Sequence, residues 1–258
     1  MSLRAALDGL TEAGGAFAVE APEGWTQGRT LYGGMTAALC AEAARRGFPD
    51  LPPLRSAQFA FTGAAAGRLR FEPALIRQGR SSSFVAVDGF AEAGQVVRAL
   101  FAHGAGRDSR IAHDSAARPP VRPPADCEPF FEGSRGGFFQ NFEMRLAAGG
   151  RPVSPGVAPT FTVWVRHLDD AGVDPAVSLL ALADSLPPAA MVAFPAPAPI
   201  STVTWSVDLL QPIPAGEWRL LASDSEQAAE GYSLQAMSLW SSDGRRLAVG
   251  RQTVAIFA

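Results

Sequence analysis

Residues 34–46 read GMTAALCAEAARR, an alanine-rich run that ends on two arginines immediately before Gly47. Alanine has the highest intrinsic helix propensity, and basic residues followed by glycine are typical of the end of a helix. The run therefore predicts a helix. Five segments have the composition of β-strands, one before this helix and four after it. They span residues 15–21, 55–62, 68–78, 83–92 and 95–103.

The same order of segments returns in the second half of the chain. Residues 176–186 form a second predicted helix. Asp174 is suited to be its N-cap, Pro175 fits its first position, and the prolines at 187–188 are expected to end it. The strands predicted in this half span residues 138–146, 161–166, 200–210, 218–225, 233–241 and 245–257. The last hairpin contains Asp-Gly, which is a strong signal for a tight turn.

A proline-rich stretch separates the two halves. Residues 117–129 read ARPPVRPPADCEP, and proline at this density excludes a regular helix or a central strand. We expect an N-terminal domain at residues 1–106, an extended connector at 107–135 and a C-terminal domain at 136–258. A helix laid in a curled antiparallel sheet is the hotdog arrangement. The predicted fold class is therefore α+β, a tandem hotdog with each sheet wrapped around a central helix. An all-β sandwich is the competing fold, and the first helix argues against it.

Composition excludes several classes of protein. Of the 258 residues, 47% are hydrophobic and 18% are charged, which indicates a globular chain. The net charge of -3 gives no basic field for a nucleic acid. Two distant cysteines, Cys40 and Cys127, indicate neither a disulfide framework nor a zinc site. The N-terminus does not have the pattern of a signal peptide, and no apolar stretch is predicted to span a membrane. We expect a soluble, cytoplasmic protein without a metal.

Asp184 is the candidate for catalysis. It is the only charged residue between Pro175 and Val207, within an apolar helix. A carboxylate in a partly dry pocket can activate or orient a water molecule. The alternative is that Asp184 lies on the exposed side of the helix or caps the following turn, and the pattern favours neither.

Gln252 and Thr202 are the next candidates. Gln252 shares a strand face with Ala248, Gly250 and Val254, so it is a lone amide among small and apolar side chains. An amide can donate a hydrogen bond to a water molecule and accept one from it. An edge position in solvent is equally compatible. Strict alternation would point Thr202 away from the helix, unless the start of its strand is twisted or bulged.

Gly33 and Gly34 open the first helix. Free N–H groups at a helix start suit a developing oxyanion, although a plain tight turn is the simpler interpretation. Aligning the halves places Ala57 opposite Thr202 and Ala102 opposite Gln252. This asymmetry indicates one composite site rather than two.

These motifs resemble the double-hotdog acyl-CoA thioesterases, the type II acyl-CoA thioesterase-like proteins. The resemblance covers nearly the whole chain. It rests on Tyr32-Gly33-Gly34-Met35, Leu182-Ala183-Asp184-Ser185, Ser201-Thr202-Val203 and Gly250-Arg251-Gln252. Members of this family use an Asp, a Thr or Ser, and a Gln to position the hydrolytic water, and the matching residues are Asp184, Thr202 and Gln252. The chain has Leu210-Gln211-Pro212 where the family often has His-Arg-Pro, and Ser185 where leucine is common.

The resemblance implies hydrolysis of an acyl thioester, expected to be an acyl-CoA, in fatty acid metabolism, without metal or organic cofactor. Leu179, Leu182 and Met191 are expected to line the acyl pocket. A homo-oligomer, dimer or larger, is also expected. Two rival functions are a non-catalytic acyl-CoA or lipid-binding hotdog protein and an enoyl-CoA hydratase or dehydratase. The hydratase or dehydratase is disfavoured because neither predicted helix carries a histidine. Of the histidines in the chain, His103 is the best candidate for the catalytic residue of such an enzyme.

Overall fold

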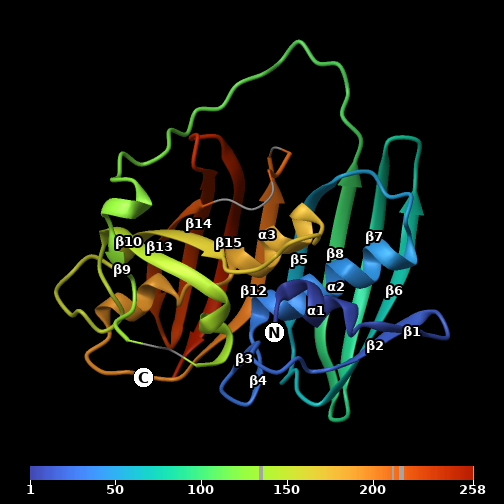
Figure 1. The fold of residues 1–258 in the computed structure, drawn as a ribbon, viewed down its shortest axis with the longest axis horizontal. Coiled ribbons are helices and arrows are strands. Elements are labelled where there is room, and N and C mark those ends of the chain that lie inside the picture. The colour runs from blue at the N-terminus through green and yellow to red at the C-terminus, as the bar shows by residue number, and fades with distance from the viewer. Residues whose placement is uncertain (134–135, 211, 215–217, 258) are drawn as a thin grey trace.

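One long antiparallel sheet organises the molecule, and two helices lie on one of its faces (Figure 1). The computed structural model describes residues 1–133, 136–210, 212–214 and 218–257. Its helices are α1 (Leu3–Asp8), α2 (Gly33–Gly47) and α3 (Pro175–Ala183), with short 3₁₀ turns η1 (Pro124–Asp126), η2 (Gly137–Asn141) and η3 (Ala189–Ala193). The strands of the first half are β1 (Thr11–Ala13), β2 (Ala16–Glu20), β3 (Thr26–Gln27), β4 (Thr30–Leu31), β5 (Leu54–Phe61), β6 (Arg68–Gln78), β7 (Ser82–Ala91) and β8 (Gly94–Gly104). Those of the second half are β9 (Glu128–Pro129), β10 (Phe142–Gly149), β11 (Thr160–His167), β12 (Ile200–Leu209), β13 (Arg219–Ala229), β14 (Tyr232–Ser241) and β15 (Arg246–Ile256).

The strand order shows the internal repeat. The 13 strands of the main sheet follow the order β1-β2-β6-β7-β8-β5-β12-β15-β14-β13-β11-β10-β9. From the centre outward, β5-β8-β7-β6-β2 matches β12-β15-β14-β13-β11. The two halves meet where β5 pairs antiparallel with β12, and Phe59 stacks on Trp205 across that junction at 5.2 Å between ring centroids. The predicted tandem hotdog is confirmed, with the two curled sheets continuous through β5 and β12.

Helices α2 and α3 pack against each other over the sheet. The middle of α2 is buried alanine, whose small side chain allows close packing. Asp174 caps α3 as predicted, since its side chain accepts hydrogen bonds from the backbone N–H groups of Ala176 and Val177, and Pro175 begins the helix. Trp25, Tyr32 and Phe142 pack together beneath the N-terminus of α2 and extend the core between the halves.

Several predicted bounds differ from the structure. Helix α3 ends at Ala183, not at residue 186, because Pro187 has no N–H to donate to the Ala183 carbonyl and its ring would collide with that carbonyl in a continued helix. Strand β10 begins at Phe142 because η2 occupies the residues before it. The predicted connector, residues 107–135, contains η1 and the edge strand β9, and its last two residues lie outside the described part of the chain.

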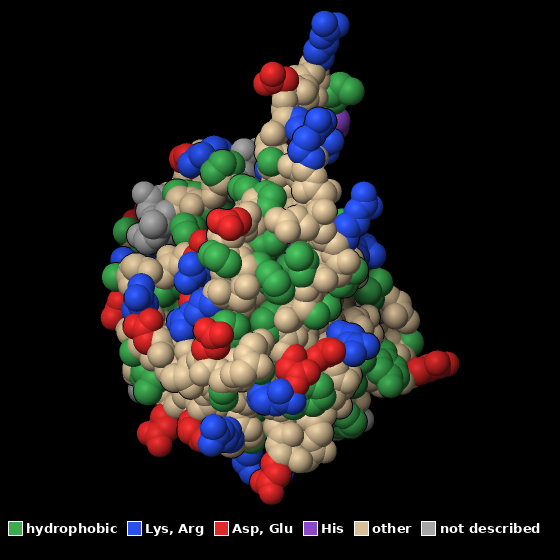
Figure 2. All heavy atoms as spheres, turned by 90° about the vertical axis from the view of Figure 1, so that its right-hand side faces the viewer, with side chains coloured by type: hydrophobic (Ala, Val, Ile, Leu, Met, Phe, Trp, Pro, Cys, Tyr) green, Lys and Arg blue, Asp and Glu red, His purple; other side chains and the backbone are tan. Residues whose placement is uncertain are grey.

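The connector leaves β8 and passes over one end of the sheet to reach β9 (Figure 1). Figure 2 shows it projecting as an arm on which basic side chains gather. Arg118 ties the arm to the second half, because its Nη1 donates to the Ser242 carbonyl at 2.9 Å. None of the helices in the described ranges is long and apolar enough to cross a bilayer.

Candidate active site

A cavity of about 570 Å³ lies where the start of α2 meets the end of α3. The segment before η3, the start of β12 and the inner face of β15 complete its wall. Its lining includes Gly33, Thr36, Phe61, Phe131, Phe138, Phe139, Asp184, Leu186, Pro187, Pro188, Met191, Thr202 and Gln252. The cavity therefore combines a few polar groups with an aromatic and aliphatic wall, which is typical of a small-molecule site.

Asp184 and Gln252 are in direct contact in this cavity. Gln252 Nε2 donates to Asp184 Oδ1 at 2.5 Å, and the backbone N–H of Gly34 also donates to the carboxylate. The turn that ends α3 at Asp184 aims its side chain toward the start of α2. Gln252 is 6% exposed and points inward from β15. Two residues 68 positions apart in sequence thus share one hydrogen bond.

Burial raises the pKa of the Asp184 carboxyl to about 7, because an ionised carboxylate loses hydration there. The hydrogen bonds from Gln252 and from the Gly34 N–H favour the ionised form and lower the pKa, but they only partly offset the burial. A carboxyl group with a pKa near neutrality can both take and return a proton under physiological conditions.

Thr202 reaches the cavity through a β-bulge. The pairing of β12 with β15 shifts register between Thr202 and Thr204, so Val203 is an extra residue in the strand. Beyond the bulge, Trp205 and Val207 face the core while Thr204 is exposed, and strict alternation would place Thr202 on the exposed side as well. The bulge reverses this alternation and brings Thr202 to the wall that Asp184 and Gln252 share.

Gly33 and Gly34 leave no room for a side chain. A Cβ built on Gly33 would lie 2.6 Å from Asp184 Oδ2, and one on Gly34 would collide with the Tyr32 ring. The Gly34 amide is engaged by Asp184, whereas the Gly33 amide has no acceptor within the described chain. The Tyr32 hydroxyl, buried under Phe138, also has no hydrogen-bond partner among the described residues. Burial, and then the nearby Asp184 charge, raise the pKa of Tyr32, so the phenol keeps its proton.

Two of the three residues expected in the acyl pocket lie elsewhere. Met191 lines the cavity, but Leu179 and Leu182 line a separate cavity of about 430 Å³ on the far side of α3. Helical periodicity explains this placement, because both leucines share a helix face that points away from the Asp184 carboxyl. The histidines also lie elsewhere: His103 Nδ1 is 2.9 Å from the Pro52 carbonyl, and His167 Nε2 is 2.9 Å from that of Ser178.

Comparisons with known proteins identify the family of the chain. Residues 21–104 match the family described as the acyl-CoA thioesterase N-terminal domain, and residues 116–256 match the acyl-CoA thioesterase C-terminal domain. The chain belongs to the acyl-CoA thioesterase family. No curated protein sequence matches this family member at a significant level.

Solved structures similar to this thioesterase-family chain span nearly its whole length. A conserved protein of unknown function with a hot dog fold from Alicyclobacillus acidocaldarius is 26% identical, with a TM-score of 0.89 and 98% of each chain covered. The acyl-CoA thioesterase II TesB2 of Mycobacterium marinum is 19% identical, with a TM-score of 0.79, and the TesB protein of Mycobacterium avium subs paratuberculosis is 17% identical, with a TM-score of 0.82. Both comparisons cover 99% of this chain and 98% of the other. At these identities the two TesB proteins support the fold alone.

Sequence patterns did not reveal every residue near this thioesterase-type cavity. Phe138 and Phe139 were predicted to begin a strand, yet they belong to η2 and form part of the cavity wall. Gln235, a fully buried amide next to Gln252 in the sheet, was not singled out. The signal that could have found it is the same lone amide in an alternating apolar strand that identified Gln252. In the described ranges, no group of three or more His, Cys, Asp or Glu is placed to hold a metal.

Proposed function

We propose that this protein hydrolyses an acyl-CoA to a free acid and CoA, with Asp184 as the base that activates water. The contact of Asp184 with Gln252 inside the cavity is the observation that carries the proposal. A carboxyl group with a pKa of about 7 is suited to proton transfer near neutral pH. Membership of the acyl-CoA thioesterase family supports the same reaction.

In the proposed mechanism, Asp184 takes a proton from a water molecule whose oxygen attacks the thioester carbonyl carbon. Gln252 and Thr202 hold that water through their amide and hydroxyl groups. The free N–H of Gly33, at the positive end of the α2 dipole, stabilises the charge that develops on the carbonyl oxygen. The carbon–sulfur bond then breaks, and the proton held by Asp184 passes to the leaving thiolate. No covalent intermediate and no organic cofactor takes part in this scheme.

The acyl chain is proposed to lie along the apolar part of the same cavity. Phe61, Leu186 and Met191 line this region, and aromatic side chains of η2 close it. The placement of Met191 supports its proposed role in the acyl pocket, whereas Leu179 and Leu182 are not part of this proposal. Participation in fatty acid metabolism and assembly into a homo-oligomer belong to the same proposal.

Replacing Asp184 by asparagine tests the assignment. Asp184→Asn keeps the shape of the side chain but removes the base, so we expect kcat to fall by about 100-fold or more. Thiol release is measured on butyryl-, octanoyl-, palmitoyl- and phenylacetyl-CoA. Asp208→Asn is the matched control, because Asp208 is an exposed aspartate of β12 on the outer face of the sheet.

Equal rates for Asp184→Asn and the parent protein would rule out Asp184 as the base. Tight binding of acyl-CoA by the parent protein without any thiol release would instead favour a binding protein. Water addition to crotonyl-CoA would favour a hydratase, although the histidines His103 and His167 do not line the cavity.

A further inference from the structure

A chain of buried polar side chains lies behind the cavity wall, in strands β13 and β14. Gln235 is completely buried. Both the oxygen and the nitrogen of its side-chain amide make a hydrogen bond. Its Oε1 accepts from the backbone N–H of Ala189 at 2.8 Å, and its Nε2 donates to Ser233 Oγ at 2.6 Å. Ser233 Oγ is in turn 2.8 Å from Ser225 Oγ.

Ala189 is the first residue of η3, which follows Pro187 and Pro188. This segment supplies both prolines and Met191 to the cavity wall. On its outer side, η3 is held by the backbone of a neighbouring loop: the N–H groups of Val153 and Ser154 donate to carbonyls of η3 at 2.7 and 2.8 Å. On its sheet side, the hydrogen bond between Ala189 and Gln235 is the one polar contact of η3 within the described part of the chain.

The position of Gln235 makes this anchor part of the site's architecture. Gln235 pairs with Gln252 across β14 and β15, so the two amides point from the sheet toward the same side. Gln252 donates a hydrogen bond to Asp184. Gln235 accepts one from Ala189, in the segment that begins at Pro187, three residues after Asp184. Removing the partner of a buried N–H costs its desolvation, so this bond favours one placement of η3 over others.

We propose that Gln235 is a positioning residue that fixes η3 as the end wall of the acyl pocket, and thereby sets the length of acyl chain that the pocket accepts. This inference rests on the proposed function for the nature of the ligand. Gln235 does not line the cavity, so its effect on the ligand passes through Ala189 and Met191. The inference also gives a role to a buried amide on a strand face where Met237 and Leu239 are buried as well.

The test uses Gln235→Met, which has a similar length but cannot accept the hydrogen bond from Ala189. The probes are S-butyl-, S-octyl- and S-dodecyl-CoA, thioethers that bind without being hydrolysed, and affinity is measured by calorimetry. We expect Gln235→Met to weaken the octyl and dodecyl ligands by about tenfold and the butyl ligand by less than about twofold. Ser225→Ala is the matched control, because it removes the far end of the polar chain and leaves the Ala189 bond intact.

If Gln235→Met folds and the affinities for all three thioethers change equally, or do not change, the inference is overturned. A purely structural role of Gln235 would lower the melting temperature without changing the preference for chain length. If Gln235→Met does not fold, Ala189→Pro removes the N–H donor instead, at a first 3₁₀ position where proline is tolerated, and the same selective loss is expected. A parent protein that binds these thioethers but hydrolyses no acyl-CoA would refute the proposed hydrolysis and leave this inference standing. A parent protein that binds none of them would overturn the inference itself.

Discussion

The environment of Asp184 predicts that the proposed hydrolysis depends on pH. Because burial raises its pKa to about 7, the carboxyl is protonated in acid and can accept a proton from water only above that value. We expect kcat/KM for an acyl-CoA to rise with pH through a midpoint of about 7 and to fall about tenfold per pH unit below it. Initial rates between about pH 5 and about pH 9 measure this profile. A midpoint in the ordinary range of an aspartate would contradict the role given to this carboxyl.

The residues of the site differed in how far the sequence could predict them. Asp184 and Gln252 stand out because each is a lone polar side chain in an apolar pattern, and the contact between them agrees with that prediction. The order of the motifs could not show that Gly34 binds the Asp184 carboxylate, because this contact depends on how α2 meets α3. Leu179 and Leu182 belong to the same predicted helix as Asp184, but the periodicity of the helix turns them away from the cavity.

The bulge in β12 decides which threonine faces the cavity. Thr202 lines it, while Thr204 is exposed on the other side of the sheet. Thr202→Val preserves the branched shape and removes the hydroxyl, so we expect kcat/KM to fall about tenfold, the cost of about one hydrogen bond to the attacking water. Thr204→Val, the same change two residues further along the strand, should leave kcat/KM unchanged. Steady-state kinetics of the pair provide the measurement, and an equal loss in both variants would exclude a specific role for the Thr202 hydroxyl.

Secondary structure was predictable where one pattern persists for many residues. In the long strands β7 and β14, buried positions alternate over most of the length, and α3 begins with an N-cap aspartate and a proline. The short helix α1 and the turn η3 were missed because neither has a full period of amphipathic pattern; they are held by tertiary contacts, such as that of Ala189 with Gln235. The bulge at Val203 is also set by pairing with neighbouring strands, which a single strand's sequence does not contain.

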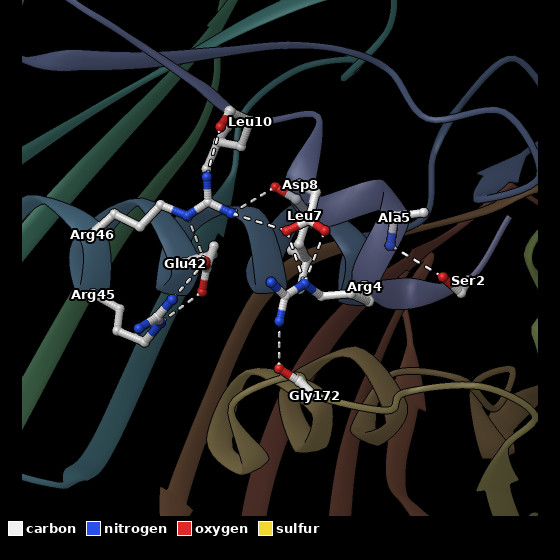
Figure 3. A network of polar contacts seen from close by, with 10 residues as sticks. All are labelled: Ser2, Arg4, Ala5, Leu7, Asp8, Leu10, Glu42, Arg45, Arg46 and Gly172. Carbon is white, nitrogen blue, oxygen red and sulfur yellow. Dashed lines mark hydrogen bonds and ion pairs between the residues drawn. The ribbon is translucent and has the colours of Figure 1, made fainter.

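Each half has a buried carboxylate at the same position relative to its central helix, but the two carboxylates, Asp184 and Glu42, have different surroundings. Asp184 lies ten residues after the N-cap of α3, Asp174, and Glu42 lies ten residues after the N-cap of α2, Tyr32. Glu42 is only 4% exposed, yet Arg45 and Arg46 bind it at 2.8 and 2.6 Å (Figure 3). Burial acts to raise the pKa of Glu42, but the hydrogen bonds and charges of the two arginines outweigh it and lower the pKa.

The Glu42 carboxylate belongs to a network of polar contacts that joins parts of the fold (Figure 3). Arg46 also donates to the carbonyls of Leu7 and Leu10, which ties α1 to α2. Arg4 donates to the Gly172 carbonyl in the other half. The residue of the first half that matches Gln252 is an alanine, as the repeat predicted, but it is Ala99. Phe59 lies opposite Trp205 across the junction of the two halves. Phe59 pairs with Ala99 in β8, and Trp205 pairs with Gln252 in β15. Ala102, the residue predicted from the turns, is one of the outward-facing positions of β8. At the matching position of the first half, the carboxylate is therefore paired with two arginines, and an alanine stands in place of the amide.

Opposite effects on stability should therefore follow from neutralising the two carboxylates. Glu42→Gln leaves two arginines without their partner, and we expect a loss of about 2 kcal/mol in the free energy of unfolding, since both arginines remain partly hydrated. Because the folded pKa of Glu42 is lowered, this contribution is present at pH 8 and at pH 5 and disappears only as the pH falls through that folded pKa. Asp184→Asn removes a carboxyl group whose folded pKa is raised to about 7, so its cost to folding grows as the pH rises from the ordinary pKa of an aspartate and is complete above about pH 7. We expect this variant to be more stable than the parent protein by about 1 kcal/mol at pH 5, where the unfolded carboxyl is already ionised, and by about 2 kcal/mol more than that at pH 8. Urea unfolding of both variants at the two pH values measures the contrast. A loss of stability for Asp184→Asn at pH 8 would show that its carboxylate is stabilised in the fold, as that of Glu42 is, and would remove the physical basis for a base poised near neutrality.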